Sequence, residues 1–294
     1  MPNAECRMPK ALRSLWTCVR TLLVIIVAAA PAGAQQRPLV TEDPETIGSG
    51  IILIEGGFDY ARDVQYPASG LQGNLIRWPT LGTSFGVGSI VEIQLDWAPY
   101  QRLAVTDRFP APLASLVDFD GDSTSDVDDL VVATKLRFLS ETPGRPALGV
   151  RFATKLPMAS NQSGLGLDTT DVFATALIGK TIQSIRVVGN IGFGILGDPT
   201  RGDRQNDALV YGISVARAIA QGFEVVGEIN GRAQQWGDDP PAGTESRAIM
   251  RIGTRYTRGS ARVDAGLLVG MTSSDPSWGF TAGVTWVFRG FTVP

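Results

Sequence analysis

The feature that most constrains this chain is a strand pattern close to its C-terminus. Every second residue there is apolar, with an aromatic residue at both ends: Trp278, Phe280, Ala282, Val284, Trp286 and Phe288. The interleaved positions hold glycine, threonine and one valine. An apolar face of about ten residues with aromatic ends is typical of strands that cross a bilayer in a β-barrel. The pattern therefore predicts a barrel strand.

The N-terminus is typical of a secretory signal over residues 1–34. A basic n-region with Arg7, Lys10, Arg13 and Arg20 precedes a ten-residue apolar core, residues 21–30, and Ala32, Gly33 and Ala34 form a small-residue cleavage site. The alternative is an N-terminal membrane anchor, which the short core disfavours. Export would carry the mature chain, from about residue 35, out of the cytoplasm.

Composition narrows the chemistry of the mature chain. Both cysteines, Cys6 and Cys18, lie inside the signal, and the whole chain has no histidine. A Ser/His/Asp triad, a thiolate nucleophile and a Cys/His metal site are therefore excluded, and we expect no enzyme. The chain carries 26 Lys/Arg and 29 Asp/Glu, of which the signal holds four and one, so the mature net charge is −6. This acidic balance disfavours nucleic acid as a partner.

Segments of about ten residues alternate apolar and polar positions from Ile51 onward. We expect about twelve antiparallel strands, an even number as in bacterial barrels. The expected ranges are 51–62, 73–85, 89–100, 128–139, 146–158, 170–180, 184–196, 208–218, 223–234, 247–256, 262–271 and 278–288.

The joins between these strands alternate in length. Those after even-numbered strands have three to six residues, whereas those after odd-numbered strands have six or more and are polar, the longest being residues 101–127. Short periplasmic turns and longer extracellular loops are the asymmetry of outer-membrane barrels. The sequence therefore predicts an all-β fold, a single transmembrane antiparallel barrel. A soluble periplasmic β-protein is the alternative, and it gives no reason for the alternation.

Charged residues and glycines gather on the face opposite the apolar one, which a barrel turns toward its lumen. The expected pore-lining bases are Arg77, Lys135, Arg137, Arg151, Lys155, Arg186, Arg232, Arg247, Arg251, Arg255 and Arg262, and the acids are Glu55, Asp59, Glu92, Asp96, Glu224, Glu228 and Asp264. Acids gather on the first, third and ninth strands and bases on the fourth, fifth and tenth. Opposed charged walls can select solutes in a pore, or can form salt bridges that stiffen or plug the barrel.

The densest acid cluster lies in the longest join. Asp118, Asp120, Asp122, Asp126 and Asp129 match the acid spacing of a calcium loop. Position six is serine instead of glycine, however, and position twelve is aspartate instead of glutamate. Two readings stay open, a Ca²⁺ site and a solvated acidic loop, and no other cofactor is expected.

Several segments resemble one known family. Residues 37–50 leading into the first strand, residues 129–138, the strand 146–157 ending in Thr-Lys-Leu-Pro, and the closing strand are similar to the phenol meta-pathway transporter family of outer-membrane β-barrels. The resemblance implies a barrel of about twelve strands that passes small, often hydrophobic or aromatic compounds without an energy source. Such barrels often end on the last aromatic residue, whereas residues 289–294 follow Phe288 here.

These observations combine into one expectation for the organisation and function. A signal (1–34) precedes an N-terminal segment (35–50) that lies in the periplasm or in the lumen, then a barrel (51–288) and a short tail (289–294). The expected function is a passive outer-membrane channel for small solutes, with membrane lipid and the barrel-assembly machinery as its other partners. A sealed structural barrel with ligand-binding extracellular loops is the alternative. An outer-membrane hydrolase would need a nucleophile constellation that the sequence lacks.

Overall fold

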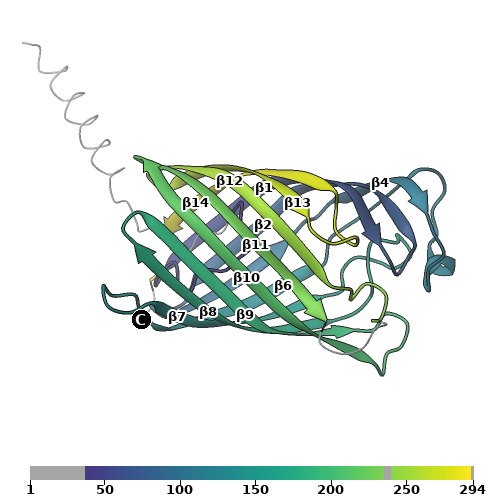
Figure 1. Cartoon of the computed structure of the whole chain (residues 1–294), viewed down its shortest axis with the longest axis horizontal. Coiled ribbons are helices and arrows are strands. Elements are labelled where there is room, and N and C mark those ends of the chain that lie inside the picture. The colour runs from purple at the N-terminus through teal and green to yellow at the C-terminus, as the bar shows by residue number, and fades with distance from the viewer. Residues whose placement is uncertain (1–36, 235–239, 293–294) are drawn as a thin grey trace, which may run out of the picture.

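The computed structural model describes residues 37–234 and 240–292 and shows a closed antiparallel β-barrel (Figure 1). The expected signal, residues 1–34, lies outside the described residues. The strands are β1 (Ile51–Tyr66), β2 (Leu71–Gly86), β3 (Val91–Trp97), β4 (Gln101–Arg108), β5 (Ser123–Asp126), β6 (Leu130–Leu139), β7 (Ala147–Leu156), β8 (Asp171–Ile182), β9 (Ile185–Gly197), β10 (Gln205–Ala220), β11 (Phe223–Gln234), β12 (Arg247–Arg258), β13 (Ala261–Gly270) and β14 (Trp278–Arg289).

The fourteen strand segments fill twelve positions around the barrel. Strand β2 pairs with β3 along its second half and with β4 along its first half, so β3 and β4 are two parts of one wall strand. In the same way β5 continues β6, because β4 pairs with β5 and β3 pairs with β6. The barrel closes where β1 pairs with β14, from Ile51 opposite Arg289 to Arg62 opposite Trp278. The expected twelve-strand antiparallel barrel is confirmed.

The outer surface is apolar. Large hydrophobic side chains point outward along the strands, among them Ile191, Phe193 and Trp286, each about 60% exposed. On β1 and β14, ring contacts join Tyr60 to Trp278 and Phe280. Because such a surface is stable only against lipid, the barrel presents a membrane-spanning belt with aromatic residues toward its ends. No helix in residues 37–234 and 240–292 is long and apolar enough to cross a membrane.

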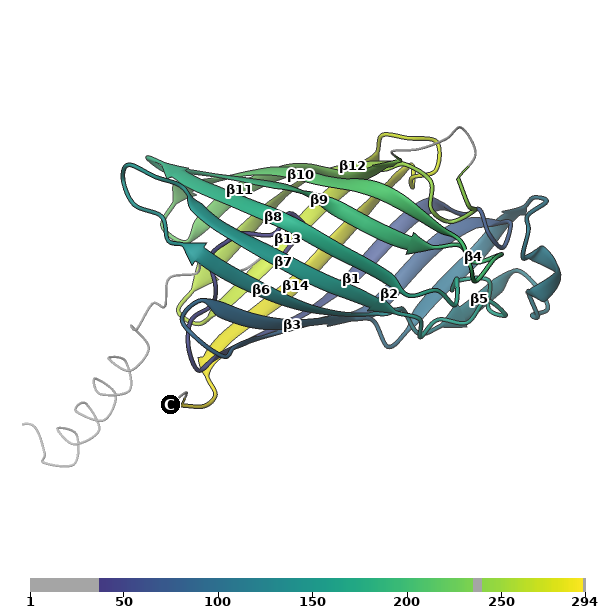
Figure 2. The same ribbon diagram turned by 90° about the horizontal axis from the view of Figure 1, so that it is seen from below.

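The two rims differ as the sequence predicts. At one end the strands are joined by residues 87–90, 140–146, 183–184, 221–222 and 259–260; we call this the short-turn rim. At the other end the joins are residues 67–70, 109–122, 157–170, 198–204, 235–246 and 271–277; we call this the long-loop rim. The C-terminus lies at the short-turn rim, opposite the hairpin of β4 and β5 (Figure 2). Short turns on one rim and long loops on the other are the asymmetry of outer-membrane barrels, whose short turns face the periplasm.

One boundary prediction is wrong. The expected third strand ends at Tyr100 and a loop follows to Val127, but the chain pairs again as β4 and returns as β5, so only residues 109–122 lie between strands. The sequence Ala98-Pro99-Tyr100 resembles a strand end because proline cannot donate to a β-ladder. Here the proline interrupts a strand that continues beyond it. Leu71, Leu75 and Leu103 fill the inside of this extension, so burial stabilises it.

Candidate functional site

The lumen holds a chain segment of its own, residues 37–50, which we call the strap. Its contacts follow the order of strands around the barrel: Arg37 meets β14, Pro38 lies by β12 and β13, and Thr41 lies by β10. Further on, Pro44 lies by β8 and β7, and Gly48 lies beside β2, next to the start of β1. The strap therefore makes one lap of the inner wall. It forms no strand, and wall side chains hold it.

The first anchor of the strap is Glu228 on β11. Its buried carboxylate accepts the backbone N–H of Val40, at 2.9 and 3.0 Å to its two oxygens, and that of Thr41, at 2.7 Å. Arg251 Nη1 donates to the same carboxylate at 2.9 Å. A carboxylate that receives two backbone donors and one guanidinium is a charge-assisted clamp.

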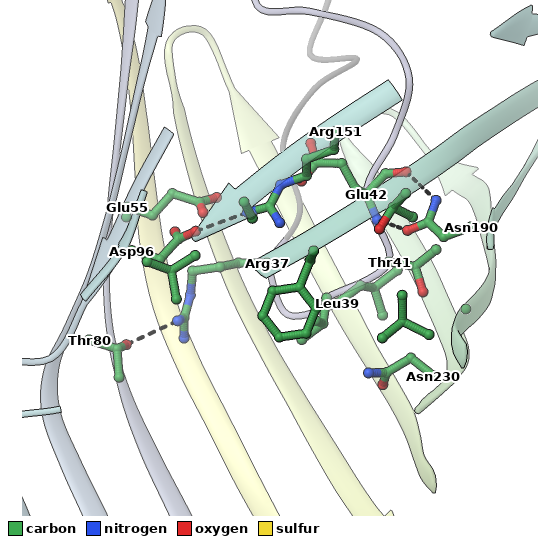
Figure 3. A pocket seen from close by; sticks show the side chains of 18 of the residues that line it. Arg37, Leu39, Thr41, Glu42, Glu55, Thr80, Asp96, Arg151, Asn190 and Asn230 are labelled. Carbon is green, nitrogen blue, oxygen red and sulfur yellow. Dashed lines mark hydrogen bonds and ion pairs between the residues drawn. The ribbon is translucent and has the colours of Figure 1, made fainter. Parts of the chain in front are cut away.

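The second anchor is Asn190 on β9. Its Oδ1 accepts the N–H of Glu42 at 2.7 Å, and its Nδ2 donates to the carbonyl of Glu42 at 2.8 Å (Figure 3). The amide side chain thus pairs with both backbone groups of one strap residue. These groups would otherwise be buried without partners, which is costly.

The third anchor is a buried charge cluster around Lys135 on β6. Its Nζ lies 2.7 Å from a carboxylate oxygen of Glu42 and 3.3 Å from one of Glu92, and neither Lys135 nor Glu92 is exposed to solvent. Glu92 also accepts the N–H of Ile47 at 2.9 Å. The cluster therefore fixes the strap at two points, Glu42 and Ile47, against the same wall.

Two further ion pairs continue along the strap toward the short-turn rim. Arg186 on β9 donates to both oxygens of Asp43, at 2.9 and 2.7 Å, and Arg137 on β6 pairs with Glu45. Arg186 also pairs with Glu141 in the turn 140–146. Burial raises the pKa of Glu141, but hydrogen bonds from Thr181 and Lys180 and the charge of Arg186 outweigh it, so the pKa falls below its ordinary value.

The start of the strap is held by Arg37. Its guanidinium donates to Thr80 at 3.1 Å, to Thr281 at 2.7 Å and to the carbonyl of Ala282 at 3.0 Å. It lies 3.5 Å from Asp264, and its own carbonyl accepts a hydrogen bond from Arg255 at 2.7 Å. Residues from β2, β12, β13 and β14 therefore converge on one arginine.

Inward glycines make room for the strap. A Cβ added at Gly57 or Gly283 would lie 2.3 or 2.4 Å from the Arg37 guanidinium, and one added at Gly212 would lie 2.8 Å from Thr41 Oγ1. A Cβ added at Gly253 on β12 or at Gly266 on β13 would lie 2.7 or 3.1 Å from Pro38. These positions are small because another part of the chain packs on them.

A cavity of about 510 Å³ lies on the long-loop side of the strap. Leu39, Val40 and Thr41 of the strap line it, and Figure 3 shows Leu39 and Thr41 at its edge. Its two sides differ: the apolar residues Phe173, Leu177 and Val210 line the side of β8 and β10, and charged residues line the side of β1 to β3. Among the latter, Asp59 and Asp128 share Arg77, at 3.0 and 3.1 Å. The cavity is therefore amphipathic.

The structure places the pore-lining candidates in four groups. The first group lines the cavity: Glu55, Asp59, Arg77, Asp96 and Arg151. The second group contacts the strap or its anchors: Glu92, Lys135, Arg137, Arg186, Glu228, Arg251, Arg255 and Asp264. The third group is the pair Glu224 and Arg262, which face each other at 3.8 Å toward the short-turn rim, and the fourth binds groups near the long-loop rim: Lys155, Arg232 and Arg247. The bases of β6, β7 and β9 face strap acids more than they face an acidic wall.

Sequence reasoning missed the acids of the strap. Glu42, Asp43 and Glu45 neutralise the basic wall, and Asn190 holds the strap, although none of the four was a candidate. A signal was present, since the inward bases Lys135, Arg137, Arg151 and Arg186 exceed the acids on neighbouring strands. Three acids just before the first strand could supply that missing charge.

The acidic loop does not gather its carboxylates. Asp129 accepts the N–H groups of Met158 and Ala159, each at 3.0 Å, and Asp126 accepts that of Ser160 at 2.8 Å. Asp118, Asp120 and Asp122 lie on the 109–122 connection, apart from these two. Within the ranges that the structure covers, no three acidic side chains stand close enough to hold a metal ion. Asp126 and Asp129 instead tie the 157–170 loop to the wall.

Comparison with known proteins gives a likeness of fold. No family model matches the sequence, and no curated protein matches it. The COG4313 outer membrane channel from Pseudomonas putida F1 is similar in structure, with a TM-score of 0.59 and 13% identity over 84% of this chain and 98% of that one. The NanC porin follows, with a TM-score of 0.50 and 10% identity over 80% of this chain and 98% of that one. At these identities the likeness shows the barrel fold of outer-membrane proteins.

Proposed function

We propose that this chain is a passive channel of the bacterial outer membrane for small solutes, including apolar or aromatic ones, with the strap as its constriction. The signal at residues 1–34 would direct export, and the barrel-assembly machinery would insert the strands into lipid. The solved structures that share the fold include a channel and a porin, which supports a transport role.

The observation that carries the proposal is the way the lumen is filled. A cavity of about 510 Å³ ends on the strap, and the strap is attached by side-chain hydrogen bonds and ion pairs rather than by strand pairing. Because none of these contacts belongs to a β-ladder, release of the strap would unpair no strand. Movement of the strap would join the cavity to the short-turn rim without disturbing the wall.

The cavity also supports a solute class. Its volume falls in the range of small-molecule sites, and its apolar side faces a side of hydrogen-bonding and charged groups. A solute with one apolar or aromatic face and one polar edge matches both sides. Selection would follow from the width left by the strap and from the charges beside it.

A reversible lock tests the role of the strap. A Cβ at Gly212 would lie 3.5 Å from the Cβ of Thr41, within the 3.5–4.5 Å of a disulfide, so Thr41→Cys with Gly212→Cys can join strap to wall. Both native cysteines lie in the first 18 residues, so the mature variant contains only this pair. In planar bilayers with KCl, we expect discrete conductance steps from the native mature chain, fewer or smaller steps from the oxidised variant, and recovery on reduction.

The second candidate function is a sealed barrel, which the fully buried Lys135 and Glu92 favour. A folded, heat-modifiable barrel that stays silent in its native, reduced and oxidised forms would support sealing and contradict the channel. Equal conductance of the oxidised and reduced forms would contradict the strap as the constriction, while leaving a channel in place.

A further inference from the structure

The carboxylates around the cavity outnumber the basic side chains. Among the described residues of its lining, three are basic and six are acidic. The bases are Arg37, Arg77 and Arg151, and the acids are Glu42, Glu55, Asp59, Asp96, Asp128 and Asp129. The lining therefore carries a formal charge of −3. A confined space lined by one sign of charge attracts solutes of the opposite sign.

The bases that neutralise these acids are each shared between two carboxylates. Arg77 lies 3.0 Å from Asp59 and 3.1 Å from Asp128. Lys155, outside the lining, lies 3.1 Å from Asp129 and 3.0 Å from Asp171. The same sharing holds for Arg37 with Asp59 and Asp264, for Lys135 with Glu42 and Glu92, and for Arg151 with Glu42 and Asp96. The partners outside the lining add two bases and three acids, so the surplus of acid remains.

Two of the lining carboxylates, Glu55 and Asp96, lie close together and are weakly paired. A Cβ added at Gly82 would lie 3.2 Å from Asp96 Oδ1 and 3.3 Å from Glu55 Oε2, so both carboxylates flank the same glycine (Figure 3). Glu55 accepts a hydrogen bond from a neutral group, the Thr285 hydroxyl, at 3.1 Å. Asp96 lies 3.6 Å from Arg151, beyond hydrogen-bond distance, and 53% of its side chain is exposed. A cationic group in the cavity would find two acceptors here.

The opposite side of the cavity suits the body of an organic solute. Phe173, Leu177 and Val210 line it. A Cβ added at Gly194 would lie 2.9 Å from two ring atoms of Phe173, so this ring covers the inner face of β9. An aromatic ring packs against apolar groups and also attracts a cation over its face. A bare metal ion would gain nothing from this side, and in the described part of the chain no three acidic side chains stand close enough to hold one.

We propose that the cavity selects amphipathic organic cations, that is, ammonium compounds with an apolar or aromatic body. The charged end lies at Glu55 and Asp96, and the body lies on Phe173, Leu177 and Val210. This inference rests on the proposed function and names the solute class of the same cavity. An anion of the same shape is disfavoured, because each lining base already serves two carboxylates.

Three probes of one shape and different charge test the proposal on the native protein. They are 2-phenylethylammonium, 2-phenylethanol and 3-phenylpropionate, titrated calorimetrically into the folded mature barrel in a nonionic detergent at low salt, with micelles alone as the blank. We expect the ammonium compound to bind at least about tenfold more tightly than either of the others, the factor that one hydrogen bond to a charged group supplies. Equal affinities, or tighter binding of the carboxylate, would overturn the proposal.

A double variant then locates the cationic end. Glu55→Gln with Asp96→Asn removes two charges and keeps the size of both side chains. Asp118→Asn with Asp120→Asn makes the same change at two exposed residues of the 109–122 connection and is the matched control. We expect the preference for the ammonium compound to be lost in the cavity variant and kept in the control. If the cavity variant does not fold, the native comparison of the three probes still decides the question.

Ion selectivity gives a second readout in planar bilayers. Under a KCl gradient we expect the reversal potential of the native chain to show preference for K⁺ over Cl⁻, to move toward zero in the cavity variant and to stay in the control. Phe173→Ala should weaken binding of the ammonium compound while leaving this potential unchanged, since it alters only the apolar side. A native potential that favours Cl⁻ would contradict the proposal.

The two proposals fail in different ways. Persistent KCl steps, with binding that does not distinguish ammonium from carboxylate, would overturn the selection of cations and leave the channel standing. A folded barrel without KCl steps that still binds the three probes in the expected order would overturn the channel and leave the cavity as a site for organic cations.

Discussion

Glu228→Gln is the substitution that tests most directly how the strap is held. In the native chain the Glu228 carboxylate accepts two backbone N–H groups, those of Val40 and Thr41, in contacts of 2.7–3.0 Å. Glutamine keeps one acceptor oxygen and turns an NH₂ donor toward the remaining N–H. The variant therefore loses at least one charge-assisted hydrogen bond and gains an unfavourable donor contact.

The expected cost is about 2–3 kcal/mol, since a hydrogen bond to a charged group contributes about 1.5–3 kcal/mol. At about 1.4 kcal/mol for each factor of ten, the population of the released strap rises roughly 30- to 140-fold. In the folded barrel, hydrogen exchange at the amides of Val40 and Thr41 should accelerate by that factor, because exchange follows the open population.

Glu224→Gln is the matched control. It makes the same chemical change on the same face of β11, but Glu224 faces Arg262 at 3.8 Å, and the strap donates no hydrogen bond to it. Strap amides that exchange at equal rates in the native chain, Glu228→Gln and Glu224→Gln would refute the assignment of Glu228 as the anchor.

Three further predictions concern the wall and the rim. Gly212→Val would place a side chain 2.8 Å from Thr41 Oγ1, so we expect a displaced strap and larger KCl conductance steps than in Gly227→Val, where the nearest atom lies at 3.5 Å. Lys135→Met leaves the buried Glu92 carboxylate without its cation and should destabilise the barrel by about 3–5 kcal/mol in guanidinium unfolding, with partial recovery on adding Glu92→Gln. Glu141 has a lowered pKa, so its stabilising contribution is present above its ordinary pKa of 4.5 and is lost as the pH falls through the lower folded value. Titration of the Thr181 amide resonance should show this loss in the native chain and not in Glu141→Gln.

The fold was predictable because each wall strand alternates outward apolar residues with inward polar ones, and this alternation is visible locally in the sequence. The alternation in residues 278–288 specifies both faces of β14, and turn residues such as Gly222 and Gly259, both with positive φ, mark the short rim. The end of the third expected strand was not predictable from its proline. Pro99 looks like the end of a strand in the sequence whether or not strand pairing resumes after it.

The site was predictable only as a set of inward positions. The alternation of inward and outward positions along each strand shows that Glu228 and Lys135 face the lumen. It does not show which groups they contact there. Their partners are strap residues up to 188 positions away in the sequence, and the strap has no periodicity of its own. Contacts between a regular wall and an irregular segment leave no repeating pattern, apart from an excess of charge and the small residues that the segment packs against.

The single lap of the strap has a consequence for how many strands the barrel can have. The strap has a fixed length, at most about 50 Å when fully extended, and it runs once around the inner wall. Its anchors fall on β11, β9, β6 and β3 in the order in which the circuit meets them. In a barrel with two more strands the strap would not reach its last anchor. In a barrel with two fewer strands the strap would be longer than the circuit it has to make. The length of the strap therefore matches the circumference of a wall with twelve strand positions.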